Sequence, residues 1–261
     1  MVLPKIAITM GDPSGIGPEI VVGAYKKSIS ELKCVPIVIG NIDFLYKAIS
    51  LKKIDINIEA IRNLRDINFV DAKTIFCFEV DIDYKEIDYG INTEYGGEFS
   101  YQCIKKAVDL ALNGEVEAIC TAPISKESLH MAGHNYPGHT EMLADFTDTK
   151  EVSLMLMTPK LNVIHVTTHM GLIDSINKID DGLVFRTIER GRVILEKVLG
   201  RDPKVGVCAI NPHAGENEAF GYGEENSKIL PAIKKCENLG WNVKGPLAAD
   251  SLFYKAARGD F

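Results

Sequence analysis

The sequence lacks the features that mark membrane, secreted and nucleic-acid-binding proteins. Its 261 residues contain no run of about 18 apolar residues. The amino terminus has no basic stretch followed by a long apolar one, so no secretion signal is predicted. Aspartate and glutamate outnumber lysine and arginine by 36 to 29, and no basic stripe stands out. We therefore expect no membrane and no nucleic-acid partner, and a cytoplasmic location.

Cysteine pairs at metal-binding or redox spacing are also missing. The six cysteines are scattered without a CxxC motif, and most have apolar neighbours, which is typical of buried free thiols. Internal repeats and low-complexity tracts are absent too, which argues against solenoids and disordered chains. With 46% hydrophobic and 25% charged residues, the composition is that of a globular protein with a sizeable core.

Short runs rich in β-branched residues alternate with longer segments that carry apolar residues at helical spacing. The predicted strands are Ile6–Thr9, Pro36–Ile39, Ile75–Phe78, Ala118–Thr121, Ser153–Met157, Val163–Thr168 and Val205–Ile210. The predicted helices are Pro18–Lys27, Gly97–Leu112, Leu183–Leu199 and Glu225–Leu239, with Gly114, Gly200 and Gly240 as stop signals. This alternation favours an α/β fold with a mostly parallel sheet.

Two weaker patterns complete the prediction of the fold. Ile54, Ile56 and Ile58 alternate with charged residues, which predicts a half-exposed edge strand. The chain becomes rich in Gly, His and Pro between about residues 125 and 150. We therefore predict a first α/β domain over residues 1–130 and a second over residues 131–261.

Loops that follow predicted strands are the first place to look for a site, because ligands of open α/β sheets bind beyond the strands' carboxyl ends. The loop after the first strand reads GDPSGIGPE, and its glycines precede a helix start that would favour an anion. Asp12 is a candidate there, although Asp12 and Ser14 could equally well cap the turn. Lys126 follows a strand and a proline-containing turn, where an ammonium could meet a carboxylate or phosphate. A solvated surface lysine is the alternative.

Histidines at predicted strand ends suggest a metal. His169 follows two threonines, and His213 stands between Pro212 and a glycine-containing turn, so both imidazoles could point into one crevice. Two such groups can bind a divalent ion, while ordinary hydrogen bonding remains open for each. Asn211 and Glu216 could orient the two rings.

The segment Tyr136–Glu141 also concentrates polar groups. Thr140 could cap a helix that starts near Glu141, with His139 facing the same end. We assign His130 and His134 to structure, because nothing joins them as a third metal ligand.

Six ordered segments together resemble the 4-hydroxythreonine-4-phosphate dehydrogenase family, over nearly the whole chain. They are MGDPSGIGPE, TAPISKE, AGHNYPGHTEMLADFT, VTTHMGL, NPHAGENEAFG and GPLAADSLF. The YPGHTE form is similar to the branch that acts on 4-phosphorylated threonate or erythronate, rather than to the vitamin B6 (pyridoxine) branch. The resemblance implies two α/β domains of the isocitrate and isopropylmalate dehydrogenase type and a homodimer with its site at the subunit interface. It also implies a nicotinamide cofactor, NAD or NADP, bound without a GxGxxG loop.

The resemblance implies roles for individual residues as well. His139 and Thr140 match the substrate-binding pair, and His169 and His213 match two of three metal-binding histidines. The predicted site residues are therefore Asp250 and Lys126 for catalysis, His139, Thr140 and Asp12 for substrate binding, and His169 and His213 for the metal.

The reaction implied by the family is a metal- and NAD-dependent oxidation, with decarboxylation, of a 4-phosphorylated hydroxy acid. Candidates are 4-hydroxythreonine 4-phosphate and 4-phospho-D-threonate. A divalent ion, Zn, Mg, Co or Mn, would lower the pKa of the substrate hydroxyl while hydride passes to NAD. The family continues past Arg258–Phe261 with a strand and a third metal histidine, so we expect a C-terminally shortened fold. A truncated, catalytically inactive relative that keeps binding or assembly surfaces is the alternative, and metal-dependent hydrolysis is a third hypothesis.

Overall fold

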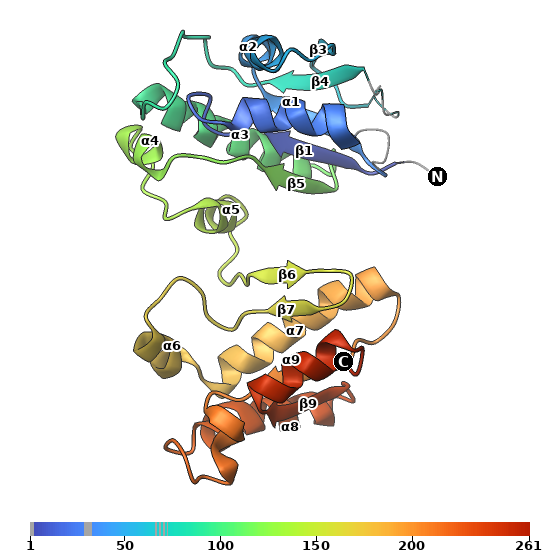
Figure 1. Cartoon of the computed structure of the whole chain (residues 1–261), viewed down its shortest axis with the longest axis vertical. Helices are drawn as coiled ribbons and strands as arrows, with labels where there is room; N and C mark the ends of the chain where they lie inside the picture. The colour runs from blue at the N-terminus through green and yellow to red at the C-terminus, as the bar shows by residue number, and fades with distance from the viewer. Residues whose placement is uncertain (1–2, 29–32, 66, 68, 70, 72) are drawn as a thin grey trace. The chain divides into compact units, whose positions relative to one another are not determined.

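The chain forms two compact units, Met1–Glu151 and Val152–Phe261. The structure is a computed structural model that describes residues 3–28, 33–65, 67, 69, 71 and 73–261. Figure 1 shows the elements of each unit along the chain. The division falls later than the predicted boundary after residue 130, because the segment that follows that residue packs with the first unit.

The first unit is built on a five-stranded parallel sheet with strand order β3-β4-β2-β1-β5. Its strands are β1 (Lys5–Thr9), β2 (Val35–Gly40), β3 (Asn57–Ile61), β4 (Thr74–Glu79) and β5 (Ala118–Thr121). The four strands predicted here from apolar runs are therefore confirmed, as is the edge position of the strand that contains Ile58. That edge strand begins later than the isoleucine alternation indicated, since Ile54 and Ile56 precede it.

Helices α1 (Gly17–Ser28), α2 (Ile42–Lys52) and α3 (Glu94–Leu112) belong to this unit. The prediction missed α2, although Asn41 is a good cap whose side chain accepts a hydrogen bond from the Asp43 backbone N–H at 2.8 Å. All six residues of the central strand β2 are buried. A strand covered on both faces reads as one apolar run, which is why β2 was recognisable in the sequence.

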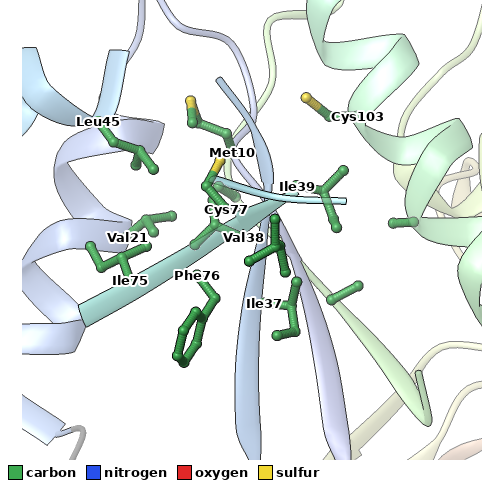
Figure 2. Packing of buried hydrophobic residues seen from close by; sticks show 14 of the residues in the cluster. Met10, Val21, Ile37, Val38, Ile39, Leu45, Ile75, Phe76, Cys77 and Cys103 are labelled. Atoms are coloured by element: carbon green, nitrogen blue, oxygen red, sulfur yellow. The ribbon is translucent and has the colours of Figure 1, made fainter. Parts of the chain in front are cut away.

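The core of the first unit collects apolar side chains from the strands and from all three helices (Figure 2). Ile37 and Ile75 from the sheet, Leu45 from α2 and Cys103 from α3 are all completely buried. All six cysteines are free thiols as predicted, but only Cys77, Cys103 and Cys236 are buried; Cys34 and Cys208 are partly exposed, and Cys120 is exposed. It lies in β5, an edge strand of the sheet, where one side of the strand has no neighbouring strand to cover it.

Two short helices, α4 (Lys126–Met131) and α5 (His139–Phe146), pack against α3. A separate buried cluster joins them through Ile104 and Val108 of α3, Leu129 of α4 and Met142 of α5. This cluster explains why residues 131–151 lie with the first unit.

The second unit contains two small sheets. Strands β6 (Met155–Met157) and β7 (Asn162–Ile164) are antiparallel, whereas β8 (Val205–Cys208) and β9 (Val243–Leu247) are parallel. The prediction missed β9, whose proline at position 246 argues against a strand in the sequence. Both β7 and β8 end earlier than predicted, so His169 lies in a loop beyond β7 rather than at its end.

The helices of the second unit are α6 (Leu172–Lys178), α7 (Asp181–Leu199), α8 (Leu230–Asn238) and α9 (Ala249–Ala257). The core lies where Phe185 and Ile188 of α7 meet Ile233 and Cys236 of α8 and Val243 of β9. Among the residues that the structure describes, no helix is both long and apolar enough to cross a membrane.

Candidate functional site

Four of the seven predicted site residues lie in the first unit and three in the second. Asp12, Lys126, His139 and Thr140 belong to the first unit; His169, His213 and Asp250 belong to the second. Each group is described in its own unit.

Asp12 turns its carboxylate onto its own loop. Its Oδ1 accepts hydrogen bonds from the Ser14 backbone N–H at 2.9 Å and from the Ser14 hydroxyl at 2.6 Å. The residue is only 3% exposed. The capping role considered for Asp12 and Ser14 is therefore confirmed, and contact between Asp12 and a substrate stays a prediction.

The loop that holds Asp12 is packed tightly on the turn that follows β5. The Asp12 backbone N–H donates to the Pro123 carbonyl oxygen at 3.1 Å. A Cβ added to Gly11, whose φ is +76°, would lie 2.2 Å from that same oxygen. Only glycine permits this approach and this backbone conformation. The carboxyl ends of the neighbouring strands β1 and β5 thus present one continuous edge.

Lys126 is the first residue of α4, and a hydrogen-bonded network around Asn92 holds that end of the helix. The Asn92 amide oxygen accepts from the Ser125 hydroxyl at 2.7 Å, and its nitrogen donates to Glu127 at 2.7 Å. Ser125 in turn accepts from the Ser128 backbone N–H, as an N-cap does. The exposed Lys126 side chain therefore projects from a well-held turn. Sequence reasoning missed Asn92, which lies 33 residues before Ser125.

His139 and Thr140 form the first turn of α5. The N-cap is Gly138, and no side chain caps this end. The capping role considered for Thr140 is therefore wrong, because the helix begins before the threonine rather than after it. The Thr140 side chain is exposed instead.

The His139 imidazole lies beside the turn after β5. Burial lowers its pKa, and a hydrogen bond with the Ala122 backbone partly opposes this shift. Its Nε2 atom is buried without a hydrogen-bond partner among the described residues. A neutral imidazole with an unsatisfied buried nitrogen is suited to meet a polar ligand group. The turn from Ala122 to Lys126 therefore contacts the Asp12 backbone and the His139 imidazole, and it ends in Lys126.

In the second unit, His213 begins a tight turn with an unusual backbone. His213, Ala214, Gly215 and Glu216 have φ values of +51°, +57°, +74° and +43°. Positive φ is costly for residues other than glycine and concentrates at functional sites. The turn brings Glu216 Oε1 to 2.6 Å from His213 Nδ1, and this contact raises the pKa of His213. The predicted role of Glu216 in orienting the ring is confirmed.

Asn211 has a different role from the predicted one. Instead of contacting a histidine, its amide nitrogen donates to Glu224 at 2.9 Å and to Glu225 Oε2 at 3.0 Å. The buried Glu225 carboxylate also accepts from the backbone N–H groups of Asn211 at 2.7 Å and Ile210 at 3.1 Å. Burial alone would raise the pKa of Glu225, but these hydrogen bonds together lower it. Glu225 thus holds the chain that leads into the His213 turn.

Replacing Glu225 by glutamine is expected to destabilise the second unit by about 2 kcal/mol at neutral pH, because hydrogen bonds to a charged acceptor are lost. A carboxyl group whose pKa is lower in the folded chain than in the unfolded chain contributes its full stabilisation above the unfolded pKa of about 4.3. This contribution disappears as the pH falls through the folded pKa. The difference between the variant and the original chain should therefore shrink in acid. Urea unfolding followed by fluorescence of the single tryptophan, Trp241, measures it. Glu237→Gln, at an exposed position of α8, is the control; an equal loss in both variants would contradict the role of Glu225.

Asp250 lies in the first turn of α9, and α9 packs against the turn that carries His213. The Asp250 charge contributes to the raised pKa of His213, after the contacts of His213 with Glu216. The structure therefore brings together Asp250 and His213, which lie beyond the carboxyl ends of the parallel strands β9 and β8. Sequence reasoning had linked these two residues only through the family resemblance.

His169 is exposed and has a φ of +53°. That its imidazole shares one ion with His213 stays a prediction. Among the described parts of the chain, no three His, Cys, Asp or Glu side chains are grouped so that they could hold a metal.

A cavity of about 260 Å³ lies elsewhere in the second unit. It is bounded by β7, α7, β8 and α9, and most of its lining is aliphatic or aromatic, including Ile164, Ile188, Val207 and Leu252. None of the predicted site residues lines it. The cavity separates the two small sheets and does not coincide with the polar groups around His213.

Comparison with known proteins identifies a family. The family described as pyridoxal phosphate biosynthetic protein PdxA matches residues 32–261. D-Threonate 4-phosphate dehydrogenase of Cupriavidus necator is 48% identical over 259 residues, which cover 99% of this chain and 78% of that protein. The protein of the same name from Salmonella typhimurium is 39% identical over 260 residues, covering 98% of this chain and 78% of the relative.

A solved structure agrees with these relatives. The crystal structure of a 4-hydroxythreonine-4-phosphate dehydrogenase from Burkholderia phymatum is 48% identical to this chain. It superposes with a TM-score of 0.92 and covers 100% of this chain and 79% of that one. The α/β fold predicted from the sequence, with its mostly parallel sheet, is confirmed.

Proposed function

Because the chain belongs to the family of pyridoxal phosphate biosynthetic protein PdxA, we propose that it oxidises a 4-phosphorylated hydroxy acid with NAD and a divalent metal. Relatives in this family are dehydrogenases, so the coarse assignment is to the oxidoreductases. Among the two acids considered above, we favour 4-phospho-D-threonate, which agrees with the names of two of the relatives. The homodimer and the cytoplasmic location implied by the resemblance are part of the same proposal.

The structural observation that carries the proposal is the contact between His213 and Glu216. A metal-binding imidazole usually donates its second N–H to a carboxylate, which leaves the other nitrogen for the ion. His213 Nδ1 meets Glu216 in this way, so its Nε2 can bind a metal. We propose His169 as a second ligand. A bound divalent ion would lower the pKa of the substrate hydroxyl, and NAD would accept the hydride.

The remaining proposed residues act by binding and by charge. In the first unit, Lys126 offers a cation to an anionic group of the substrate, and the neutral imidazole of His139 offers its unpartnered Nε2 as a hydrogen-bonding group. Thr140 supplies an exposed hydroxyl beside it. In the second unit, Asp250 keeps a carboxylate near His213, where it can take up a proton released by the substrate.

The proposal is tested with the purified chain, 4-phospho-D-threonate, NAD and a single metal at a time. We expect NADH to appear, as followed by its near-ultraviolet absorbance, and D-threonate without phosphate to react far more slowly. The same assay with 4-hydroxythreonine 4-phosphate compares the two substrates. A folded chain that produces no NADH with any metal would overturn the dehydrogenase assignment. Unchanged metal content in a His169→Ala, His213→Ala double variant would overturn the metal site.

A further inference from the structure

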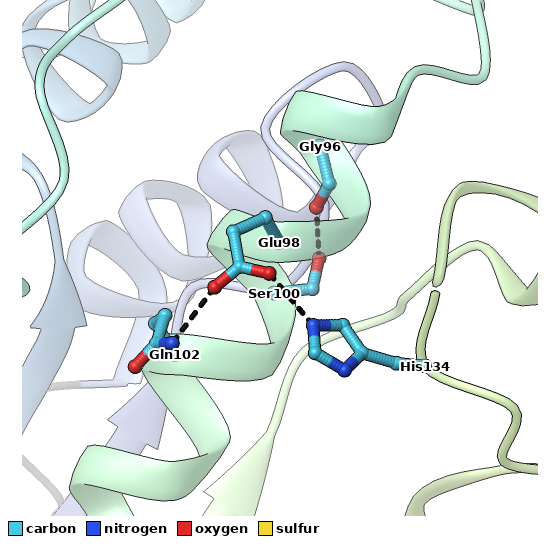
Figure 3. A network of polar contacts seen from close by, with 5 residues as sticks. All are labelled: Gly96, Glu98, Ser100, Gln102 and His134. Atoms are coloured by element: carbon cyan, nitrogen blue, oxygen red, sulfur yellow. Dashed lines mark hydrogen bonds and ion pairs between the residues drawn. The ribbon is translucent and has the colours of Figure 1, made fainter. Parts of the chain in front are cut away.

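The loop between α4 and α5 carries a histidine that the proposed function does not use. His134 Nε2 lies 2.7 Å from Glu98 Oε2 on α3, and Figure 3 shows the ring directed at that carboxylate. The ring also stacks on Tyr101, with centroids 3.6 Å apart and planes inclined by 1°. His134 is predicted from the sequence to be structural, and these two contacts define what it holds.

A second hydrogen bond holds the Glu98 carboxylate that contacts this imidazole. Its second oxygen accepts a hydrogen bond from Gln102, one turn further along α3, at 2.7 Å. Burial acts to raise the pKa of Glu98, but the contacts with Gln102 and His134 and the charge of Lys105 outweigh it and lower the pKa. The carboxylate is therefore ionised at neutral pH, and its hydrogen bond with His134 is charge-assisted.

Tyr136 attaches the same loop to α5. Its hydroxyl donates to Asp145 Oδ2 at 2.5 Å, and its ring lies edge-on to Phe146. Tyr101 contacts His134, Tyr136 and Phe146 at once, with centroid distances of 3.6, 6.4 and 5.2 Å. The loop is therefore attached both to α3 and to α5 just before the chain reaches His139.

These attachments lie immediately before the start of α5. Ordering a loop costs conformational entropy, so a loop that is already ordered presents its side chains to a ligand at a lower free-energy cost. The first residues after this loop are His139, whose buried Nε2 has no hydrogen-bond partner in the described part of the chain, and Thr140. Among the described residues no side chain caps this end of α5, so His139 and Thr140 are supported there by the preceding loop and by the hydrogen bond of His139 with the Ala122 backbone.

We propose that His134 is a positioning residue, which holds the loop so that His139 and Thr140 face the substrate, through its contacts with Glu98 and Tyr101. This inference rests on the proposed function, in which His139 and Thr140 contact the substrate. His134 itself touches α3 and acts through the two residues that follow the loop.

The kinetic test uses His134→Ala and the conservative His134→Gln. The alanine removes both contacts, whereas the glutamine amide can still donate to Glu98 and lie flat on Tyr101. We expect His134→Ala to raise KM for the phosphorylated acid about 10-fold while kcat and KM for NAD stay near their original values. His134→Gln should keep the KM for the phosphorylated acid close to its original value. His130→Gln, in the last turn of α4 and exposed, is the matched control.

A second readout does not depend on activity. Proton–carbon NMR resolves the imidazole signals of the six histidines, and His139→Gln identifies the signal of His139 by its loss. In the original chain and in His134→Gln, His139 should titrate below the usual histidine pKa. In His134→Ala, its pKa should return toward the ordinary value, because His139 gains contact with water. Glu98→Gln should move it in the same direction by less.

The outcomes separate the two proposals. If the original chain produces no NADH, the proposed function fails while the NMR titration still decides whether His134 positions His139. If His139 titrates alike in His134→Ala and in the original chain, and only thermal stability falls, His134 is merely structural and the inference is overturned. An equal rise of KM in His130→Gln would overturn it as well.

Discussion

Replacing His213 by alanine is expected to reduce the rate of NADH formation about 100-fold or more. The variant loses the imidazole that Glu216 orients at 2.6 Å, and with it a proposed metal ligand. Removing even a residue that orients a metal ligand typically costs 10- to 100-fold, so loss of the ligand itself should cost at least as much. The turn should survive, because Ala214 already adopts positive φ there as an alanine.

The measurement is kcat at saturating substrate and metal, together with the metal content of the purified protein. The kcat of Glu216→Gln should lie between those of His213→Ala and the original chain, about 10-fold below the original. The amide oxygen of the glutamine still accepts a hydrogen bond from the ring but carries no charge. His130→Gln controls for the loss of an exposed histidine in general. Full activity and full metal content in His213→Ala would rule out the proposed role.

Replacing Gly97 by alanine should destabilise the first unit by about 3 kcal/mol, the upper part of the range for overpacking. A Cβ at Gly97 would lie 1.9 Å from the Ser128 carbonyl oxygen and 2.8 Å from the Leu129 nitrogen. Both are backbone atoms of α4, so no side-chain rotation can relieve the clash. The helix must move away from α3, and the hydrogen bonds that hold the turn before Lys126 should weaken with it.

Gly23→Ala is the matched control for this substitution. Gly23 lies in α1, and a Cβ there would meet no atom of the described residues within 4 Å. Alanine is the better helix former, so this variant should gain up to about 1 kcal/mol. Urea unfolding followed by circular dichroism compares the free energies of unfolding of the two variants. Hydrogen exchange assigns the change to the first unit. A Gly97→Ala chain as stable as the original would mean that the α3–α4 contact is looser than the structure indicates.

Strands and helix ends were predictable where one local rule acted alone. Buried parallel strands such as β2 leave apolar runs, because both of their faces are covered. The stop signals Gly114, Gly200 and Gly240 all have positive φ, the conformation that ends a helix most readily with glycine. The prediction failed for β9, where a proline stands inside a strand, and for Thr140, where the helix begins earlier than its best capping residue.

The site residues were predictable as residue types, but only contacts between residues close in sequence could be foreseen. His213 and Glu216 lie close in sequence, so their pairing could be foreseen. Asn211 could not be assigned correctly, because its partner Glu225 lies 14 residues further on, in the segment Glu225–Ile229 that packs against α7 and α8. His134 and Glu98 are 36 residues apart, and no local pattern connects them.

The sequence by itself determined the α/β class, most of the parallel strands, the family and the seven candidate side chains. These follow from local periodicity, from turn chemistry and from motifs that stay intact within a few residues. Only the tertiary structure decided that Asp12 caps its own loop, that Glu225 holds the turn of His213, and that His134 attaches the loop before His139 to α3. The Asp12 cap is a local contact that the sequence had left open beside a binding role. The contacts of Glu225 and His134 join residues 14 and 36 positions apart, and packing brings their atoms within 3 Å, which no short stretch of the chain specifies.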